Sequence, residues 1–191
     1  GVDLYKNYYN KKLKKNIILF PARILLHKGI IEFIKAAEML STTYKNWEFL
    51  IAGATEYDSP ISINQKNIND LISSKNIRFI GYQNNLSKLM NASKIVCLPS
   101  YREGMPRSIL EACAMELPST CANVPGCKEI VTDKLSGLLC KPKDSESLFQ
   151  AMSSMLRMTQ SSRIEMGIEG RKRVEENYSE DIVIKKAQEA L

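Results

Sequence analysis

The feature that most constrains the fold is a regular alternation of short apolar runs with segments of helical periodicity. The apolar runs are five to seven residues long and apolar almost throughout, which is typical of strands buried on both faces. They are residues 16–22, 47–53, 77–81, 94–100, 118–123 and 137–142. Between them, residues 30–41 carry Ile30, Phe33, Ile34, Ala37 and Leu40 at helical spacing. The alternation predicts an α/β fold with a doubly wound, Rossmann-like parallel sheet.

The predicted helices follow the strands and have recognisable starts. They are residues 30–41, 63–74, 86–93, 106–116 and 145–156, with two more at the end of the chain. Asp144 and Ser179 are expected to cap the helices that follow them. In doubly wound sheets, ligands bind beyond the carboxyl ends of the strands, so the chemistry is expected in the strand-to-helix loops. These are residues 22–29, 53–62, 81–85, 99–106 and 123–128.

Composition and charge are those of an ordinary globular domain. Of the 191 residues, 44% are hydrophobic and 25% charged, and no apolar run approaches the ~20 residues of a membrane-spanning helix. The net charge is +6, of which +4 lies in residues 1–15. We expect residues 1–15 to be a linker at the start of an excised piece, and residues 16–191 to be one domain. The stretch "KKLKK" is either solvated or close to an anionic membrane surface, and nucleic acid is not an expected partner.

The cysteines and the single histidine argue against a metal site. The cysteines are odd in number and no two have CxxC spacing, so free buried thiols in a reducing cytoplasm are expected. They are Cys97, Cys113, Cys121, Cys127 and Cys140. His27 is interpreted as a loop histidine, and the acidic stretch "EYD" at 56–58 as loop.

The first strand-to-helix loop, "ARILLHKG", carries two cations beside a predicted helix start. Arg23 and Lys28 could hold an anion together with the helix N-terminus before which Gly29 stands. The alternative is that both are ordinary surface charges. Neither GxGxxG nor GxxxxGK[ST] occurs, so a dinucleotide loop and a P-loop are not supported.

The fourth loop, "SYREGMPRSILEACA", places two glutamates around a helix start. Pro106 fits the first helical position, so the amides of Arg107 and Ser108 would point out of the helix end. Glu111, one turn further along, can accept two hydrogen bonds from a vicinal diol such as a ribose. Glu103 stands in the loop, and Gly104 is expected to allow the tight turn beside it. A single glutamate would be interpreted as a solvated surface residue, but two of them around this helix start, with Arg23 and Lys28 on the first loop, favour a ligand-binding site.

Three signatures in order resemble the donor-binding, carboxyl-terminal half of the retaining glycosyltransferases of family 4, which have the GT-B fold. "SYREGMPRSILEACA" is similar to the family's E-x7-E stretch, and "ARILLHKG" is similar to its G-R-x4-K-G. "VPGCKEIVTDKLSGLL" is similar to the glycine-containing segment before the sixth strand. The resemblance runs from about residue 1 to about residue 180.

The resemblance implies transfer of a sugar from a nucleotide diphosphate donor, with UDP as the expected nucleotide, to an acceptor hydroxyl with retention of configuration. Arg23 and Lys28 would hold the diphosphate and stabilise the leaving group, Glu103 would bind the donor sugar, and Glu111 the ribose. The remaining expected contacts are the amides of Met105, Arg107 and Ser108 to sugar and phosphate, with Gly104 in the same loop, and Gly81 and Tyr82 near the base. No metal and no other cofactor is expected.

The departures from the family pattern limit what the chain can do alone. Ala22 replaces a common glycine, and Pro106 removes one amide that some members use. The half that binds the acceptor is missing, and His27 is not the histidine which that half supplies, so the chain alone is expected to be inactive. The sequence of these motifs looks closest to that of bacterial enzymes that build polysaccharide or O-antigen precursors on a lipid carrier at the cytoplasmic membrane face. Alternatives are a stand-alone donor-binding subunit, a GT-B nucleotide-sugar epimerase and a non-enzymatic interaction module.

Overall fold

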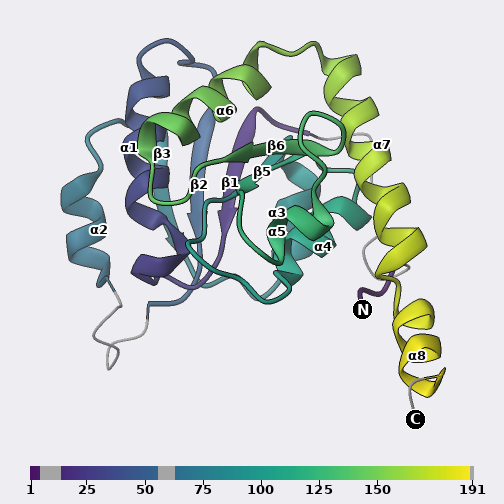
Figure 1. Cartoon of the computed structure of the whole chain (residues 1–191). Helices are drawn as coiled ribbons and strands as arrows, with labels where there is room; N and C mark the ends of the chain where they lie inside the picture. The colour runs from purple at the N-terminus through teal and green to yellow at the C-terminus, as the bar shows by residue number, and fades with distance from the viewer. Residues whose placement is uncertain (5–13, 56–62, 190–191) are drawn as a thin grey trace.

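The computed structural model describes residues 1–4, 14–55 and 63–189, in which six parallel strands form one sheet (Figure 1). The strands are β1 (Ile17–Pro21), β2 (Glu48–Ala52), β3 (Ile77–Gly81), β4 (Ile95–Leu98), β5 (Ser119–Ala122) and β6 (Gly137–Cys140). Their order in the sheet is β3-β2-β1-β4-β5-β6. Each strand lies inside its predicted range, so the prediction of a doubly wound parallel sheet is confirmed.

Helices cover both faces of the sheet. They are η2 (Leu26–Lys28), α1 (Ile30–Ser41), α2 (Gln65–Leu71), α3 (Leu86–Ala92), α4 (Arg107–Ala114), α5 (Cys127–Ile130), α6 (Ser145–Arg157), α7 (Gln160–Asn177) and α8 (Glu180–Glu189). On one side α6 returns to pack against α1, and on the other α7 packs against α4 (Figure 1). The sequence did not predict two short elements. They are the 3-10 turn η2 inside the first loop, and α5, which starts within the predicted loop 123–128.

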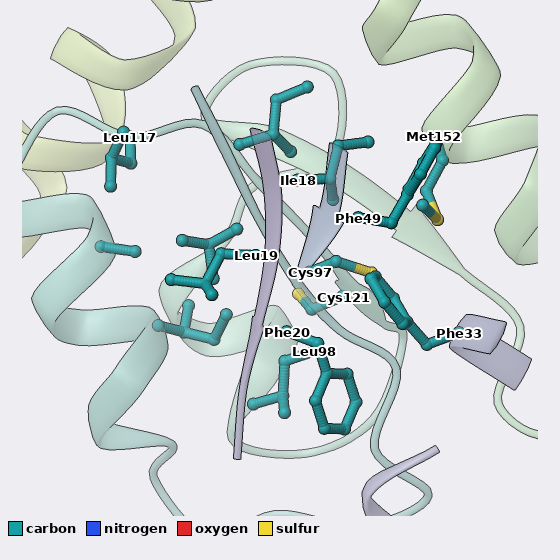
Figure 2. Close-up of a cluster of buried hydrophobic side chains, with 14 of the residues drawn as sticks. Ile18, Leu19, Phe20, Phe33, Phe49, Cys97, Leu98, Leu117, Cys121 and Met152 are labelled. Atoms are coloured by element: carbon teal, nitrogen blue, oxygen red, sulfur yellow. The ribbon is translucent and has the colours of Figure 1, made fainter. Parts of the chain in front are cut away.

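The core lies between the sheet and these helix layers. Ile18 of β1 is the register partner of Phe49 of β2, and both lie on the side of α1 and α6 (Figure 2). Phe33 and Met152 come from those two helices, and all four side chains are fully buried. The alternate residue, Leu19, lies on the opposite side, because successive side chains of a strand point to opposite faces. The strands are therefore mainly apolar, although β5 begins with the buried Ser119 and Thr120 and β3 carries the exposed Arg78.

Two helix starts test the predicted caps. The Asp144 side chain accepts a hydrogen bond from the Ser147 amide at 2.8 Å, so the predicted cap of α6 is confirmed. Pro106 is not the first helical residue, because its ψ of 106° is extended and α4 begins one residue later. The Pro106 carbonyl accepts from the amides of Ile109 and Leu110, which makes Pro106 the N-cap. Ser179 directly precedes α8 as predicted.

The first residues pack against the end of the chain. Val2 is buried, and its amide donates to the Tyr178 carbonyl at 3.0 Å. Lys14 is half-buried, and burial lowers its pKa to about 8, so the prediction of a solvated stretch does not hold at this residue. The rest of "KKLKK" up to residue 13, and "EYD" at 56–58, lie outside the described residues.

The cysteines are free and buried, as predicted. Burial raises the pKa of the Cys113 thiol to about 12. Within residues 1–4, 14–55 and 63–189, no helix combines the length and the apolar character needed to cross a bilayer.

Candidate functional site

The strand order places the candidate site. β1 and β4 are neighbours in the sheet, yet the chain after β1 returns through α1 to β2 on one side, and the chain after β4 goes through α4 to β5 on the other. The crevice between the carboxyl ends of two such strands is where ligands bind in open α/β sheets. The loops after β1 and β4 are the ones that carry the predicted cations and glutamates.

The loop after β1 turns sharply so that α1 can start against the end of β4. Gly29 has a φ of +78°, in the left-handed region that favours glycine. A Cβ at this position would lie 2.2 Å from the carbonyl oxygen of Pro99, so only glycine fits. Lys28 is the residue directly before Gly29, where the backbone comes close to Pro99. The two loops are thus brought into backbone contact beside the predicted cation.

Lys28 and Glu103 meet across this contact. The Lys28 Nζ lies 2.7 Å from Glu103 Oε1, and the two residues are 75 positions apart in the sequence. Their side chains are 17% and 9% exposed, respectively, so the ion pair is largely removed from solvent. A charge-assisted hydrogen bond of this kind is short and strong, and each partner would be costly to bury alone. Two residues predicted from separate motifs therefore belong to one site.

The second glutamate lies on the first turns of α4. Glu111 Oε1 is 3.9 Å from Nη2 of Arg107, whose side chain is 83% exposed, so this contact is a loose pair at i and i+4. Because Pro106 is the N-cap, the amides of Arg107 and Ser108 are the first two of the helix, and such amides have no partner within the helix. They point out of the helix end with the favourable dipole, as predicted.

The glycine-containing segment at residues 124–139 contacts the loop that carries Glu103, through Gly126 and Gly104. Gly126 has a φ of +84°, and a Cβ there would lie 2.3 Å from the Gly104 carbonyl oxygen and 3.0 Å from that of Glu103. The Glu129 carboxylate accepts a hydrogen bond from the Gly126 amide and fixes the turn before α5. Gly104 has an unfilled space at its own Cβ position and no positive φ, so the expected reason for a glycine there, a tight turn, is not the observed one.

The electrostatics of the site are dominated by cations. The pKa of His27 is lowered by burial and then by the positive charges of Lys28 and Arg102. Arg23 also lowers this pKa, although its own side chain is exposed. His27 Nδ1 is buried without a hydrogen-bond partner among the described residues. The edge of the sheet at β1 and β4 is therefore a positive environment suited to an anion.

The predicted base-binding residues lie further along the same edge. Gly81 ends β3, with a φ of +68°, and Tyr82 follows it with its side chain 70% exposed. β3 is separated from β4 by β2 and β1, which is about 14 Å at the usual strand spacing. Met105, also exposed, lies beside Gly104 in the loop of Glu103. The structure brings Lys28 and Glu103 into contact and leaves Gly81 and Tyr82 at a distance on the same edge.

Sequence reasoning missed the residues that support the loops. The hydroxyl of the partly buried Tyr101, two residues before Glu103, donates a hydrogen bond to the buried carboxylate of Glu32. The only available signal was an acidic residue in the first turn of a predicted helix, which is normally read as a favourable charge for the helix dipole. Across the described part of the chain, no group of three or more His, Cys, Asp or Glu side chains could hold a metal ion.

Comparisons with known proteins give the family. The model described as Glycosyl transferases group 1 matches residues 2–173. The chain is 33% identical over 143 residues to N,N'-diacetylbacillosaminyl-diphospho-undecaprenol alpha-1,3-N-acetylgalactosaminyltransferase of Campylobacter jejuni, covering 75% of this chain and 36% of that protein. The chain spans less than half the length of the curated relatives it matches.

Solved structures show the same fold. The carboxyl-terminal domain of the glycosyl transferase group 1 protein LpcC from Francisella tularensis superposes with a TM-score of 0.81 at 25% identity, over 94% of this chain and 100% of that one. Anabaena HepE, in a complex with UDP and glucose, gives a TM-score of 0.82 at 17% identity, over 100% of this chain and 54% of that one. The predicted fold class is confirmed, since the structural neighbours are GT-B glycosyltransferases. Because the matched family model covers nearly the whole sequence, the chain belongs to the group 1 glycosyl transferases.

Proposed function

We propose that this chain is the donor-binding half of an enzyme that transfers a sugar from a UDP-sugar to an acceptor hydroxyl with retention of anomeric configuration. The observation that carries the proposal is the contact between Lys28 and Glu103 at the crevice between β1 and β4. A cation and a carboxylate from two different loops can there reach a phosphate and the sugar attached to it. Charged groups fixed in place before the reaction stabilise the charge that develops on a leaving group.

In this proposal each group has a separate task. Arg23 and Lys28 bind the diphosphate and stabilise the departing nucleotide, so no metal ion is required. Glu103 accepts hydrogen bonds from hydroxyls of the donor sugar. Glu111 accepts hydrogen bonds from the two ribose hydroxyls, because an ionised carboxylate has two acceptor oxygens. The amides at the start of α4 and of Met105 bind phosphate and sugar oxygens.

The layout of the sheet edge supports an extended ligand. The base would lie near Gly81 and Tyr82, at the end of β3, and the sugar near Glu103, after β4. These places are about 14 Å apart, which leaves the ribose and the diphosphate to cross the ends of β2 and β1. The solved complex of Anabaena HepE with UDP and glucose is a neighbour of this fold, which supports the choice of UDP as first probe.

The names of the relatives support a proposal for the acceptor and the cellular setting. The Campylobacter jejuni relative is named as acting on a diphospho-undecaprenol glycan. We propose a related task here, in bacterial surface polysaccharide or lipid-linked glycan synthesis, on the cytoplasmic side of the membrane. The acceptor would be bound by a second half of the longer protein, and the basic residues near the start of the chain would lie close to the anionic membrane surface.

Calorimetric titration of the chain with UDP, GDP and ADP tests the donor site. One nucleotide should bind, and Arg23→Ala, Lys28→Ala and Glu111→Ala should each weaken it ~10- to 100-fold, since each removes a charge-assisted contact. Lys172→Ala, at an exposed position on α7, is the matched control and should bind like the wild type. The double variant Lys28→Ala with Glu103→Ala separates lost phosphate contact from the effect of leaving Glu103 unpaired.

Two results would contradict the proposal. One is a wild type that binds none of the three nucleotides, both as this chain and joined to an acceptor half. The other is equal affinity in the wild type and all three site variants. Retention is tested separately. This chain is joined to an acceptor-binding half, and the anomeric configuration of the product formed from a UDP-sugar is determined.

A further inference from the structure

Tyr101 anchors the start of the loop that carries Glu103 at two points. Its backbone amide donates to the His27 carbonyl at 2.8 Å. Its hydroxyl donates to both carboxylate oxygens of Glu32, at 2.8 and 2.9 Å. His27 directly precedes Lys28, and Tyr101 stands two residues before Glu103. The backbone anchor therefore lies within two residues of both members of the ion pair, and the side-chain anchor reaches Glu32, four residues after Lys28.

Glu32 is an unusual residue for its place in the fold. It lies in the first turn of α1, where the helix dipole favours a negative charge, but its exposed fraction is only 9%. Burying a carboxylate is costly unless hydrogen bonds satisfy it, and the single proton of the Tyr101 hydroxyl is shared between the two Glu32 oxygens. A buried residue chosen only for packing at this position would be apolar.

The Tyr101 hydroxyl stays protonated and can therefore act as a hydrogen-bond donor. Burial, together with the hydrogen bond to Glu32, raises the Tyr101 pKa to about 12, so the hydroxyl keeps its proton throughout the physiological range. The Lys143 ammonium lies 5.2 Å from the centre of the Tyr101 ring, within the range of a cation–π contact. Lys143 follows β6, so the loops after β1, β4 and β6 all converge on Tyr101.

We propose that Tyr101 and Glu32 are positioning residues that hold Glu103 in register with Lys28, so that the sugar-binding carboxylate is set before the donor arrives. This inference rests on the proposed function, because it takes Glu103 to be the contact to the donor sugar. The hydrogen bonds are directional, and the backbone bond to His27 joins the two loops beside the ion pair. A misplacement of about 1 Å at such a site can cost ~100-fold in rate.

The alternative is that the pair only stabilises the fold, and a double substitution separates the two roles. In Tyr101→Phe with Glu32→Leu, the hydroxyl and the carboxylate are both replaced by apolar atoms of similar shape, which can be neutral or stabilising. The phenyl ring remains for Lys143. The thermal midpoint should therefore stay at or above that of the wild type while the loop loses its side-chain anchor and keeps the backbone bond to His27. Tyr178→Phe, which removes a hydroxyl bonded to the Glu129 carbonyl at 2.8 Å, is the matched control.

Hydrogen exchange of the Tyr101 amide, which donates to the His27 carbonyl, is the first measurement, and it needs no ligand. We expect exchange to rise about tenfold in the double variant and to stay at the wild-type rate in Tyr178→Phe, a change equivalent to roughly 1.4 kcal/mol. Unchanged exchange in the double variant overturns the inference.

Affinities for UDP and UDP-galactose are the second measurement. The double variant should bind UDP within about threefold of the wild type and lose about tenfold in affinity for UDP-galactose relative to UDP, because only the sugar contact depends on Glu103. An equal loss for both ligands, or no loss for either, overturns the positioning role. A wild type that binds no nucleotide defeats the proposed function instead, and the exchange result then still decides whether Tyr101 and Glu32 fix the loop.

Discussion

The contact between Gly126 and the loop of Glu103 gives a prediction with a magnitude. In Gly126→Ala the new residue must keep a φ of +84°, which costs about 1–2 kcal/mol for a residue with a Cβ. The Cβ would lie 2.3 Å from the Gly104 carbonyl oxygen, about 1 Å short of the 3.4 Å at which ordinary contact begins. That oxygen belongs to the backbone and cannot rotate away, so the loop has to move. The lower entropy of the unfolded alanine chain offsets about 0.4–1 kcal/mol.

The net loss in unfolding free energy is therefore expected to be about 2 kcal/mol. Urea unfolding followed by circular dichroism measures it, and with a slope of about 2 kcal/mol/M the midpoint should fall by about 1 M. Gly104→Ala is the stability control, because nothing lies within 4 Å of its Cβ position, and it should leave the unfolding free energy unchanged or raise it by up to about 1 kcal/mol. Equal midpoints for Gly126→Ala and the wild type would refute the reasoning, as would an equal fall in both variants.

Two further predictions concern His27 and Asp144, the N-cap of α6. His27 has a lowered pKa in the folded chain, so the unfolded chain takes up a proton first as the pH falls through 6.5, and stability should decrease from pH 7.5 to pH 5.5. Since the chain has one histidine, His27→Gln should flatten the dependence of the urea midpoint on pH in this window, and an unchanged slope would contradict the assignment. Asp144→Ala removes the cap of α6 and should lower the unfolding free energy by about 1 kcal/mol, whereas Asp144→Asn should retain most of it. Equal losses in both would mean that charge rather than the hydrogen bond is the source.

The sequence predicts the local parts of this fold well. Each of the six predicted runs contains one strand, because a strand buried on both faces favours apolar residues at most positions, with Ser119 and Thr120 of β5 as polar exceptions. The helix at 30–41 was placed correctly for a similar reason, since its apolar spacing matches one buried face. Both signals are contained within a dozen residues and do not depend on the rest of the chain.

The supporting contacts of the site could not be predicted in this way. Glu32 and Tyr101 are 69 positions apart, and their meeting depends on β1 and β4 being neighbours, which no local pattern specifies. The role of Gly126 likewise depends on the Glu103 loop that packs against it. The shift of the start of α4 by one residue has a smaller cause: proline has a helical φ at the N-cap as well as at the first helical position, and only its ψ distinguishes the two.

The contact between Lys28 and Glu103 has a consequence for how a donor would enter. In the free chain the cation that would bind the diphosphate and the carboxylate that would bind the sugar satisfy each other, with little solvent around either. A diphosphate near Lys28 competes with Glu103 for the same ammonium protons, and each hydrogen bond it takes leaves a carboxylate lone pair without a donor. Because an unsatisfied buried carboxylate is costly, that lone pair has to find a new donor, and sugar hydroxyls can supply it. Under the proposed function, a free nucleotide diphosphate would displace the pair without offering this replacement, whereas a nucleotide sugar would offer both halves, so the pair would favour the intact donor over the product.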